Sequence, residues 1–436
     1  MRVGAMADPS ATLAHAARHS SPALMARMSA MMFLQYWPQG IWAVTFTTYI
    51  VANTGTVGAG IFSAGFVGYT TAAGAIGSLI SPVIIGFLSD RYFAAERLLA
   101  ALHAGCALAA WGMFRSQTEL EFLLCIVLYY QCFCPAAALT NKIGLRHLAN
   151  VDVEYPWVRI FGTVGWIGAG LFLGFVWPLV TGQLIEATRI PLFLGACGSS
   201  MMALYCLTLP HTPPERRASV ARLGIVRDSG ELLRNGPLVT FLAVSMLACI
   251  STTAYNNCGN PFLNHEGYPR PAALMTLGQL SELLCLWAAP WLIARYGLRV
   301  LFVVGVIGWG IRYALLATGS YLGAAPPVYA AILLHGPCYV FVYVIGVMYV
   351  DRLAGSAHRG AAQGLYALAS AGLGHLIGAL TVGLAQAALL TPEGVSPPPY
   401  HWTAFWIVPA AFSLTAAIMF KVAFRPPQSQ IQIEPA

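Results

Sequence analysis

Charged side chains are scarce along this chain. Asp, Glu, Lys and Arg together make up 9% of its 436 residues, whereas an average soluble domain has roughly 25%. Hydrophobic residues make up 58%, and a water-soluble fold cannot bury so large an apolar fraction. The composition therefore excludes an ordinary soluble domain and predicts a protein that is embedded in a membrane.

Residues and motifs that are missing exclude several chemistries. Lysine occurs only at positions 142 and 421, so the chain has no phosphate-binding P-loop. The 10 cysteines lie within or beside apolar stretches, and Cys132 and Cys134 are spaced C-x-C, so we expect neither a disulfide nor a bound metal. No H-E-x-x-H motif or Ser/His/Asp arrangement occurs at membrane depth, so we expect no enzyme and no cofactor.

Apolar stretches follow one another along most of the chain. Polar and Pro/Gly-rich breaks separate about twelve of them, each close to the ~20 residues that a helix needs to cross a bilayer. The sequence thus predicts an all-α membrane protein with twelve transmembrane helices. We expect these helices near residues 30–52, 62–88, 97–114, 120–142, 156–181, 190–210, 237–258, 271–294, 298–319, 326–350, 361–389 and 402–424.

The basic residues indicate how these helices are oriented. An even number of crossings places both termini on one side, and basic residues concentrate on the cytoplasmic side of membrane proteins. All but five of the 23 Lys and Arg residues fall in the tails and the even-numbered connections, so we expect both termini in the cytoplasm of a multi-pass inner-membrane protein. The net charge of +7 then reflects orientation and gives no reason to expect nucleic-acid binding. The five exceptions are Arg115, Arg159, Arg189, Arg270 and Arg312.

A long polar break divides the helices into two groups of six. Motifs recur six helices apart on either side of it, which predicts two pseudo-symmetric six-helix bundles. The expected domains are a cytoplasmic tail (1–29), a first bundle (30–210), a cytoplasmic linker (211–236), a second bundle (237–424) and a cytoplasmic tail (425–436). The paired motifs are Gly86–Arg91 with Arg295–Arg299, Arg159–Gly162 with Arg359–Gly364, and the GxxxG spacings Gly170/Gly174 and Gly374/Gly378, which predict matching packing seams.

Three charged residues stand at membrane depth: Glu282, Arg159 and Arg312. Charges there are costly unless they face a partner or a water-filled cavity, so we interpret Glu282 and Arg159 as lining a transport pathway. Arg159 could instead pair with Glu282, or with a carbonyl at a helix end, to lock the halves together. We expect Arg312 to lie toward the outer end of its helix and extend to the interface, and we expect His103 and His375 to be core histidines.

Polar residues share helix faces with these charges. Arg159, Thr163 and Trp166 are spaced i, i+4, i+7 on the fifth helix and offer a fork of donors, a hydroxyl and an aromatic face. On the eighth helix Gln279 and Glu282 share a face, and Thr253 and Asn256 do so on the seventh. This set suits a nucleoside, whose base can stack and whose sugar and base edges form hydrogen bonds, although a sugar would use similar groups.

The chain resembles the major facilitator superfamily, and within it the nucleoside:proton symporter family. The resemblance implies alternating access between the two bundles and proton-coupled import of nucleosides. It also implies substrate contacts at Arg159, Thr163, Trp166, Asn256, Gln279 and Glu282. The motifs that carry it are Gly86–Arg91, Phe33–Tyr36, Arg159–Gly165, Leu207–His211, Gly259–Leu263, Gln279–Glu282, Ala294–Gly297 and Ala362–Gly364.

Four positions depart from the pattern of that family. Its glutamine on the seventh helix falls on Thr253, and a tyrosine and a phenylalanine on the tenth fall on His335 and Tyr339, which we include in the expected substrate site. Its aspartate falls on Val340, which cannot carry a proton. The remaining candidates for proton coupling are therefore Glu282 and His335, because a buried carboxylate and an imidazole can both change protonation state.

The loop after the second helix holds a separate group of charges. We expect Asp90, Arg91 and Arg97 to form a cytoplasmic latch that gates the conformational change through charge pairing.

The expected partners are a nucleoside, the proton as coupling ion and membrane lipid, and we expect a monomer. Two alternatives stay open: a transporter of sugars or other small polar metabolites, and a transport-dead membrane sensor.

Overall fold

The structure is a computed structural model that describes residues 19–55, 60–214, 230–355, 358–390 and 400–425. These residues form helices joined by short connections, with one isolated bridge between Thr54 and Phe62. The expected tail 1–18, the linker segment 215–229 and the tail 426–436 lie outside the described residues. The elements are α2 (Pro22–Ala43), α3 (Phe46–Ala52), α4 (Phe66–Arg91), α5 (Ala95–Arg115), α6 (Glu119–His147), α7 (Val151–Leu171), η1 (Phe172–Val176), α8 (Trp177–Thr181), α9 (Ile190–Cys206), α11 (Gly236–His265), α12 (Pro271–Leu322), α13 (Ala325–Leu333), α14 (His335–Tyr339), η2 (Val340–Val344), α15 (Ile345–Ala354), α16 (Arg359–Ala367), η4 (Leu368–Gly374), α17 (His375–Leu389) and α18 (Trp402–Ala423).

Apolar composition and length make most of these helices suitable for crossing a membrane. Among the described residues, nine are long and apolar enough to do so. One of them, Pro271–Leu322, has 52 residues, more than twice the ~20 that one crossing requires. It bends at Gly297, whose φ of 73° favours glycine, and this bend separates the eighth and ninth predicted helices.

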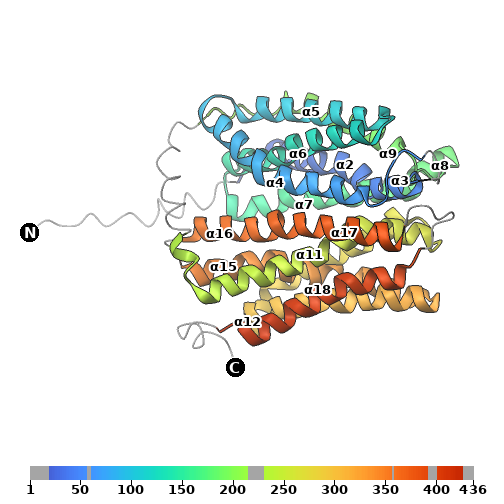
Figure 1. Ribbon diagram of the computed structural model, residues 1–436. Helices are drawn as coiled ribbons and strands as arrows, with labels where there is room; N and C mark the ends of the chain where they lie inside the picture. The colour runs from blue at the N-terminus through green and yellow to red at the C-terminus, as the bar shows by residue number, and fades with distance from the viewer. Residues whose placement is uncertain (1–18, 56–59, 215–229, 356–357, 391–399, 426–436) are drawn as a thin grey trace, which may run out of the picture.

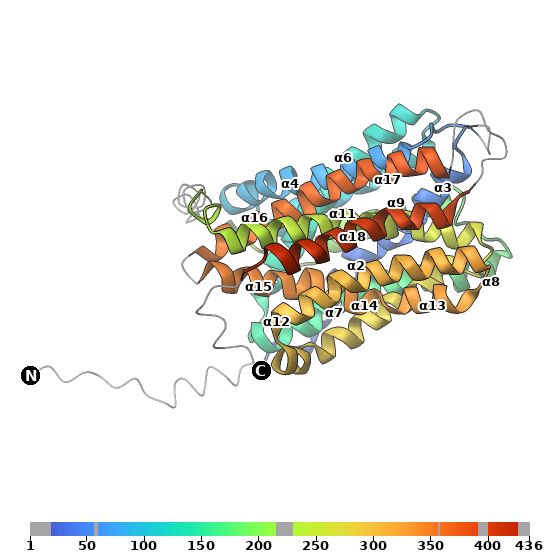
Figure 2. The ribbon, with the colours of Figure 1, turned by 60° about the horizontal axis from the view of Figure 1, so that its bottom comes forward.

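The helices form two bundles that lie side by side (Figure 1). In the first half α2 packs along α7 and α9, while α5 packs along α6 and α9 and α4 along α6. In the second half α11 packs along α17 and α18, and α12 along α13, α14 and α18. The helix pairs that join the halves include α4 with α17 and α7 with α12, and the first of these is visible in Figure 2.

Small residues allow these two pairs to approach closely. A side chain at Gly68 would meet Gly383 of α17, and side chains at Gly170 and Gly174 would meet Ala272 and Ala273 of α12. Gly170 and Gly174 therefore form a seam between the halves.

The second predicted GxxxG seam has a different role. Gly374 and Gly378 pack against α11, at Cys249 and Thr253, inside the second half. The prediction of matching seams was wrong, because sequence spacing shows which helix face is small but not which helix covers it.

The first helix also begins earlier than expected. We predicted a start near residue 30, but α2 begins at Pro22, where Ser21 accepts a hydrogen bond from the backbone nitrogen of Leu24. Apolar composition marks the membrane-embedded part of a helix, whereas the N-cap and a proline in the first turn determine where the helix starts.

Candidate functional site

A cavity of about 520 Å³ lies between the two halves. Its volume falls within the roughly 300–1,000 Å³ that is typical of small-molecule sites. Residues of α2, α4, α6 and α7 line it from the first half, and residues of α11, α12, α14 and α17 from the second. The structure brings to this cavity all nine residues that were predicted to contact substrate: Arg159, Thr163, Trp166, Thr253, Asn256, Gln279, Glu282, His335 and Tyr339.

The wall from the first half combines a cation with aromatic rings. Helix α7 places Arg159, Thr163 and Trp166 on the cavity side, as their spacing predicted. The guanidinium carbon of Arg159 lies 4.8 Å from the centre of the Tyr36 ring on α2, so a cation–π contact holds this side chain. Tyr36 also lines the cavity, although the sequence analysis assigned it no role.

The wall from the second half presents amides, a carboxylate and an imidazole. Glu282 is mostly buried, and its Oε2 lies 3.8 Å from Nε2 of His335. One turn earlier on α12, Oε1 of Gln279 is buried and has no hydrogen-bond partner among the described residues. Asn256 of α11 is exposed to the cavity. These groups can donate to and accept from a polar ligand.

Arg159 and Glu282 face the cavity from opposite halves. The ion pairs among the described residues do not include one between them, and Arg159 lies on Tyr36 instead. The alternative in which this pair locks the halves together is therefore not what the structure shows. A ligand in the cavity has a cation on one side and a carboxylate on the other.

Arg312 does not extend to the membrane interface. Its side chain is completely buried, and its guanidinium carbon lies 3.4 Å from the centre of the Tyr255 ring and 5.0 Å from that of Trp309. The prediction was wrong because α12 packs against α14, and the side chain of Arg312 contacts His335 of that helix in the protein interior. Arg312 donates from Nη1 to Nδ1 of His335 at 3.0 Å.

The two core histidines predicted on apolar faces differ in their surroundings. His103 is buried and bonded to Gln35, as expected. His375 instead lines the cavity, and its Nε2 lies 3.0 Å from the hydroxyl of Tyr343. The π-helical segment η2 carries Tyr343, and such segments often occur at functional positions in helices. Val340, which begins this segment, is fully buried.

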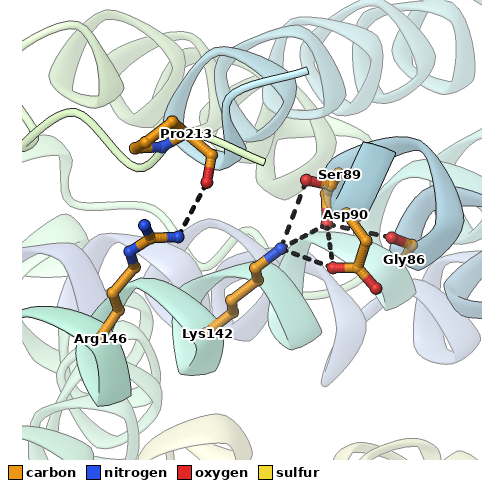
Figure 3. A network of polar contacts seen from close by, with 6 residues as sticks. All are labelled: Gly86, Ser89, Asp90, Lys142, Arg146 and Pro213. Atoms are coloured by element: carbon orange, nitrogen blue, oxygen red, sulfur yellow. Dashed lines mark hydrogen bonds and ion pairs between the residues drawn. The ribbon is translucent and has the colours of Figure 1, made fainter. Parts of the chain in front are cut away.

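The predicted latch is built differently from what we expected. Asp90 pairs with Lys142 of α6 at 2.7 Å, and Lys142 also donates to the hydroxyl of Ser89 (Figure 3). Arg91 lies near the rings of Phe87 and Tyr92. The described ion pairs do not join Asp90 to Arg91 or Arg97, and the gating role of these three residues stays a prediction. The sequence did not indicate Lys142 as the partner of Asp90, because the two residues are 52 positions apart.

The halves are bonded to each other at the end of the bundle that carries α3 and α8, called here the α3–α8 end (right in Figure 1). The side chain of Glu186, between α8 and α9, accepts from Nδ2 of Asn260 at 2.7 Å, Nδ2 of Asn264 at 3.2 Å and the backbone nitrogen of Ala272 at 3.1 Å. Asn260 also accepts from Thr48 of α3. Burial raises the pKa of the Glu186 carboxyl, although its three donors oppose the shift.

These bonds connect the two halves at one end of the bundle. Hydrogen bonds between the halves include those of the Glu186 cluster, the Thr48–Asn260 bond and a bond from Thr71 to Asn257. The Asp90–Lys142 pair at the other end joins two helices of the same half. The bonds of the Glu186 cluster and of Thr48 thus hold the two halves together at the α3–α8 end.

Solved structures of transporters have folds similar to that of this chain. The crystal structure of the nucleoside transporter NupG matches with a TM-score of 0.80 and 23% identity, covering 93% of this chain and 100% of that one. A D-xylose-proton symporter matches with a TM-score of 0.68 and 14% identity, covering 93% and 98%. The chain has the same fold as these two solved structures, which confirms the predicted fold class.

A family model and proteins of similar sequence identify the family. Residues 23–429 match the family model described as Nucleoside H+ symporter. The putative nucleoside transporter YegT of Escherichia coli (strain K12) is 32% identical over 414 residues, which are 93% of this chain and 95% of that protein. Xanthosine permease of the same organism is 26% identical, covering 92% and 95%. The chain belongs to the nucleoside H+ symporter family, which confirms the predicted family and shows that the protein is a membrane transporter and not an enzyme.

Proposed function

We propose that this protein imports nucleosides together with protons, and that the cavity between its halves is the binding site. The observation that carries this assignment is the convergence of Arg159, an aromatic face at Trp166 and the carboxylate of Glu282 on one cavity from both halves. A site shared between two bundles is exposed to one side and then the other as the bundles rock against each other.

The cavity groups divide naturally between the parts of a nucleoside. Trp166 offers a face on which any base can stack. Gln279 and Asn256 offer amide groups for the base edge or the ribose hydroxyls, and the buried, unpartnered Oε1 of Gln279 is available to accept from a ligand. Thr163 and Tyr339 add hydroxyl groups from opposite walls. Thr253 contributes less, because its hydroxyl donates to the backbone oxygen of Cys249.

Glu282 is the proposed proton carrier. It is mostly buried, it lines the cavity, and it faces Arg159 across the space that the ligand would occupy. Approach and departure of a cation during the transport cycle would favour the charged and the neutral carboxyl in turn. His335 is adjacent to Glu282 and is bonded to Arg312 on its other side, so the geometry favours Glu282 over His335.

The orientation that we propose places the Asp90–Lys142 pair and both termini in the cytoplasm of a bacterial inner membrane, in agreement with the distribution of basic residues. The Glu186 cluster then closes the outer side, and the cavity communicates with the cytoplasm. The two halves over 30–210 and 237–424 are proposed as the units that rock, and the monomer, surrounded by lipid, as the working form.

Uptake into proteoliposomes tests this function. Radiolabelled uridine, adenosine and a hexose are offered with an inward proton gradient, with and without an uncoupler. Nucleoside accumulation that the uncoupler abolishes is expected, with loss of binding in Arg159→Ala and Gln279→Ala. Gln183→Ala, at an exposed position outside the cavity, is the matched control. Accumulation of the hexose but of no nucleoside would establish the sugar alternative, and the absence of any uptake or nucleoside binding would contradict transport of this substrate class.

A further inference from the structure

One arginine, Arg312, is buried behind the wall of the cavity. Arg312 is fully buried, and its Nε and Nη2 have no hydrogen-bond partner among the described residues. Its charge is compensated by the faces of Tyr255 and Trp309, 3.4 Å and 5.0 Å from the guanidinium carbon. A charge at this depth is costly, so its one directed contact indicates what it does.

That contact determines where His335 holds its proton. Nη1 of Arg312 lies 3.0 Å from Nδ1 of His335. A guanidinium can only donate, so Nδ1 must accept through its lone pair. A hydrogen on Nδ1 would instead place two donors against each other at 3.0 Å. The imidazole is therefore neutral and carries its hydrogen on Nε2.

The Nε2 hydrogen points toward the cavity side of the ring. Nε2 lies 3.8 Å from Oε2 of Glu282, and both residues line the cavity. The ring is held in its plane by Tyr339, whose ring centre lies 5.5 Å away at an interplanar angle of 24°, and by Tyr255 at 6.0 Å. These two ring contacts restrict its orientation, and the cavity wall presents the Nε2 donor of His335 beside the carboxylate acceptor of Glu282.

We propose that Arg312 is a positioning residue that fixes His335 as an Nε2 hydrogen-bond donor. A substrate must then offer a hydrogen-bond acceptor to His335 next to the donor group that it offers to Glu282. The choice of nucleoside as the ligand rests on the proposed function. Nucleosides satisfy this requirement, because their base edges and ribose hydroxyls place acceptors beside donors. His335 then recognises substrate and does not carry the transported proton.

Nuclear magnetic resonance of purified protein tests the fixed hydrogen without any substrate. Protein labelled with nitrogen-15 at histidine is measured at pH 7, and the His335 signals are assigned by their loss in His335→Gln. A protonated Nε2 with a bare Nδ1 is expected. A hydrogen on Nδ1, with or without one on Nε2, overturns the proposal. In Arg312→Met the His335 ring should no longer carry its hydrogen on Nε2 alone. Arg295→Met, which changes an exposed residue at the end proposed as cytoplasmic, should leave the position of that hydrogen unchanged. If Arg312→Met does not fold, the wild-type spectrum alone still decides.

Substitutions of His335 test the donor in binding. In His335→Gln the amide nitrogen reaches the place of Nε2, whereas in His335→Asn it reaches only the place of Nδ1. We expect His335→Gln to bind uridine within about threefold of the wild type, and His335→Asn and His335→Leu to bind about tenfold or more weakly. Equal binding by the Gln and Leu variants overturns the donor role. If the wild-type protein binds no nucleoside, the proposed function fails, whereas the nuclear magnetic resonance result still tests the position of the hydrogen.

Discussion

Replacing Asn260 by alanine is expected to open the α3–α8 end of the protein. Asn260 is buried on α11 and contacts the first half twice, since it donates to Glu186 at 2.7 Å and accepts from Thr48. The substitution removes both bonds and leaves the Glu186 carboxylate buried with one donor fewer. In the open state water can hydrogen-bond the same groups, so the substitution lowers the stability of the closed state alone.

The size of the effect follows from these two bonds. A hydrogen bond to a charged group contributes about 1.5–3 kcal/mol and a neutral one about 0.5–1.5 kcal/mol, so the closed state loses about 2–4.5 kcal/mol. Because 1.4 kcal/mol corresponds to about a tenfold change, the open-to-closed ratio rises about 30-fold or more. An open state populated at about 1% would then reach roughly a quarter of the molecules.

Electron spin resonance can measure this shift as a distance. Spin labels on unnatural amino acids at Gln183 and Tyr321 report on the two halves, because both residues are exposed at the α3–α8 end. A longer distance should gain population in Asn260→Ala, and still more in Asn260→Asp, which places a second carboxylate against Glu186. Ser63→Ala serves as control, since it removes the hydrogen bond that the Ser63 hydroxyl donates to Glu119 at the same end but within the first half. Distances unchanged in both Asn260 variants would refute the assignment of this cluster as the outer closure.

Three further predictions concern charged groups. Burial raises the pKa of Glu186 in the closed state above the value that it has when solvated, so the closed state binds the proton more tightly. The population of the shorter distance, which reports the closed state, should therefore rise as the pH falls from 7 toward the ordinary carboxyl pKa of about 4.3. This pH dependence should vanish in Glu186→Gln. A fall in that population at lower pH would contradict the prediction. Asp90→Asn and Lys142→Met should each change the exchange rate more than nucleoside affinity, and the charge-swapped double variant should restore it; a variant with normal exchange and much weaker binding would oppose a gating role. Glu282→Gln should abolish uptake against a gradient while counterflow exchange persists, whereas uncoupler-sensitive accumulation by this variant would show that Glu282 is not the proton carrier.

The membrane setting and most of the binding site could be predicted from the sequence because both depend on local properties. Apolar length determines which segments can cross a bilayer, and helical periodicity determines which side chains share a face. Arg159, Thr163 and Trp166 reached the cavity together for this reason, and Gln279 and Glu282 did so on α12. The repeated motifs then predicted two bundles with the site between them.

Other features depended on contacts between segments that are distant in sequence. Lys142 became the partner of Asp90 only through the packing of α4 on α6, and Glu186 gained its three donors from α11 and α12. The packing of α12 against helix α14 decided that Arg312 is buried against His335. A charged residue in a sequence shows that a partner is needed, because desolvation is costly, but only the tertiary structure decides which group, helix or half supplies it.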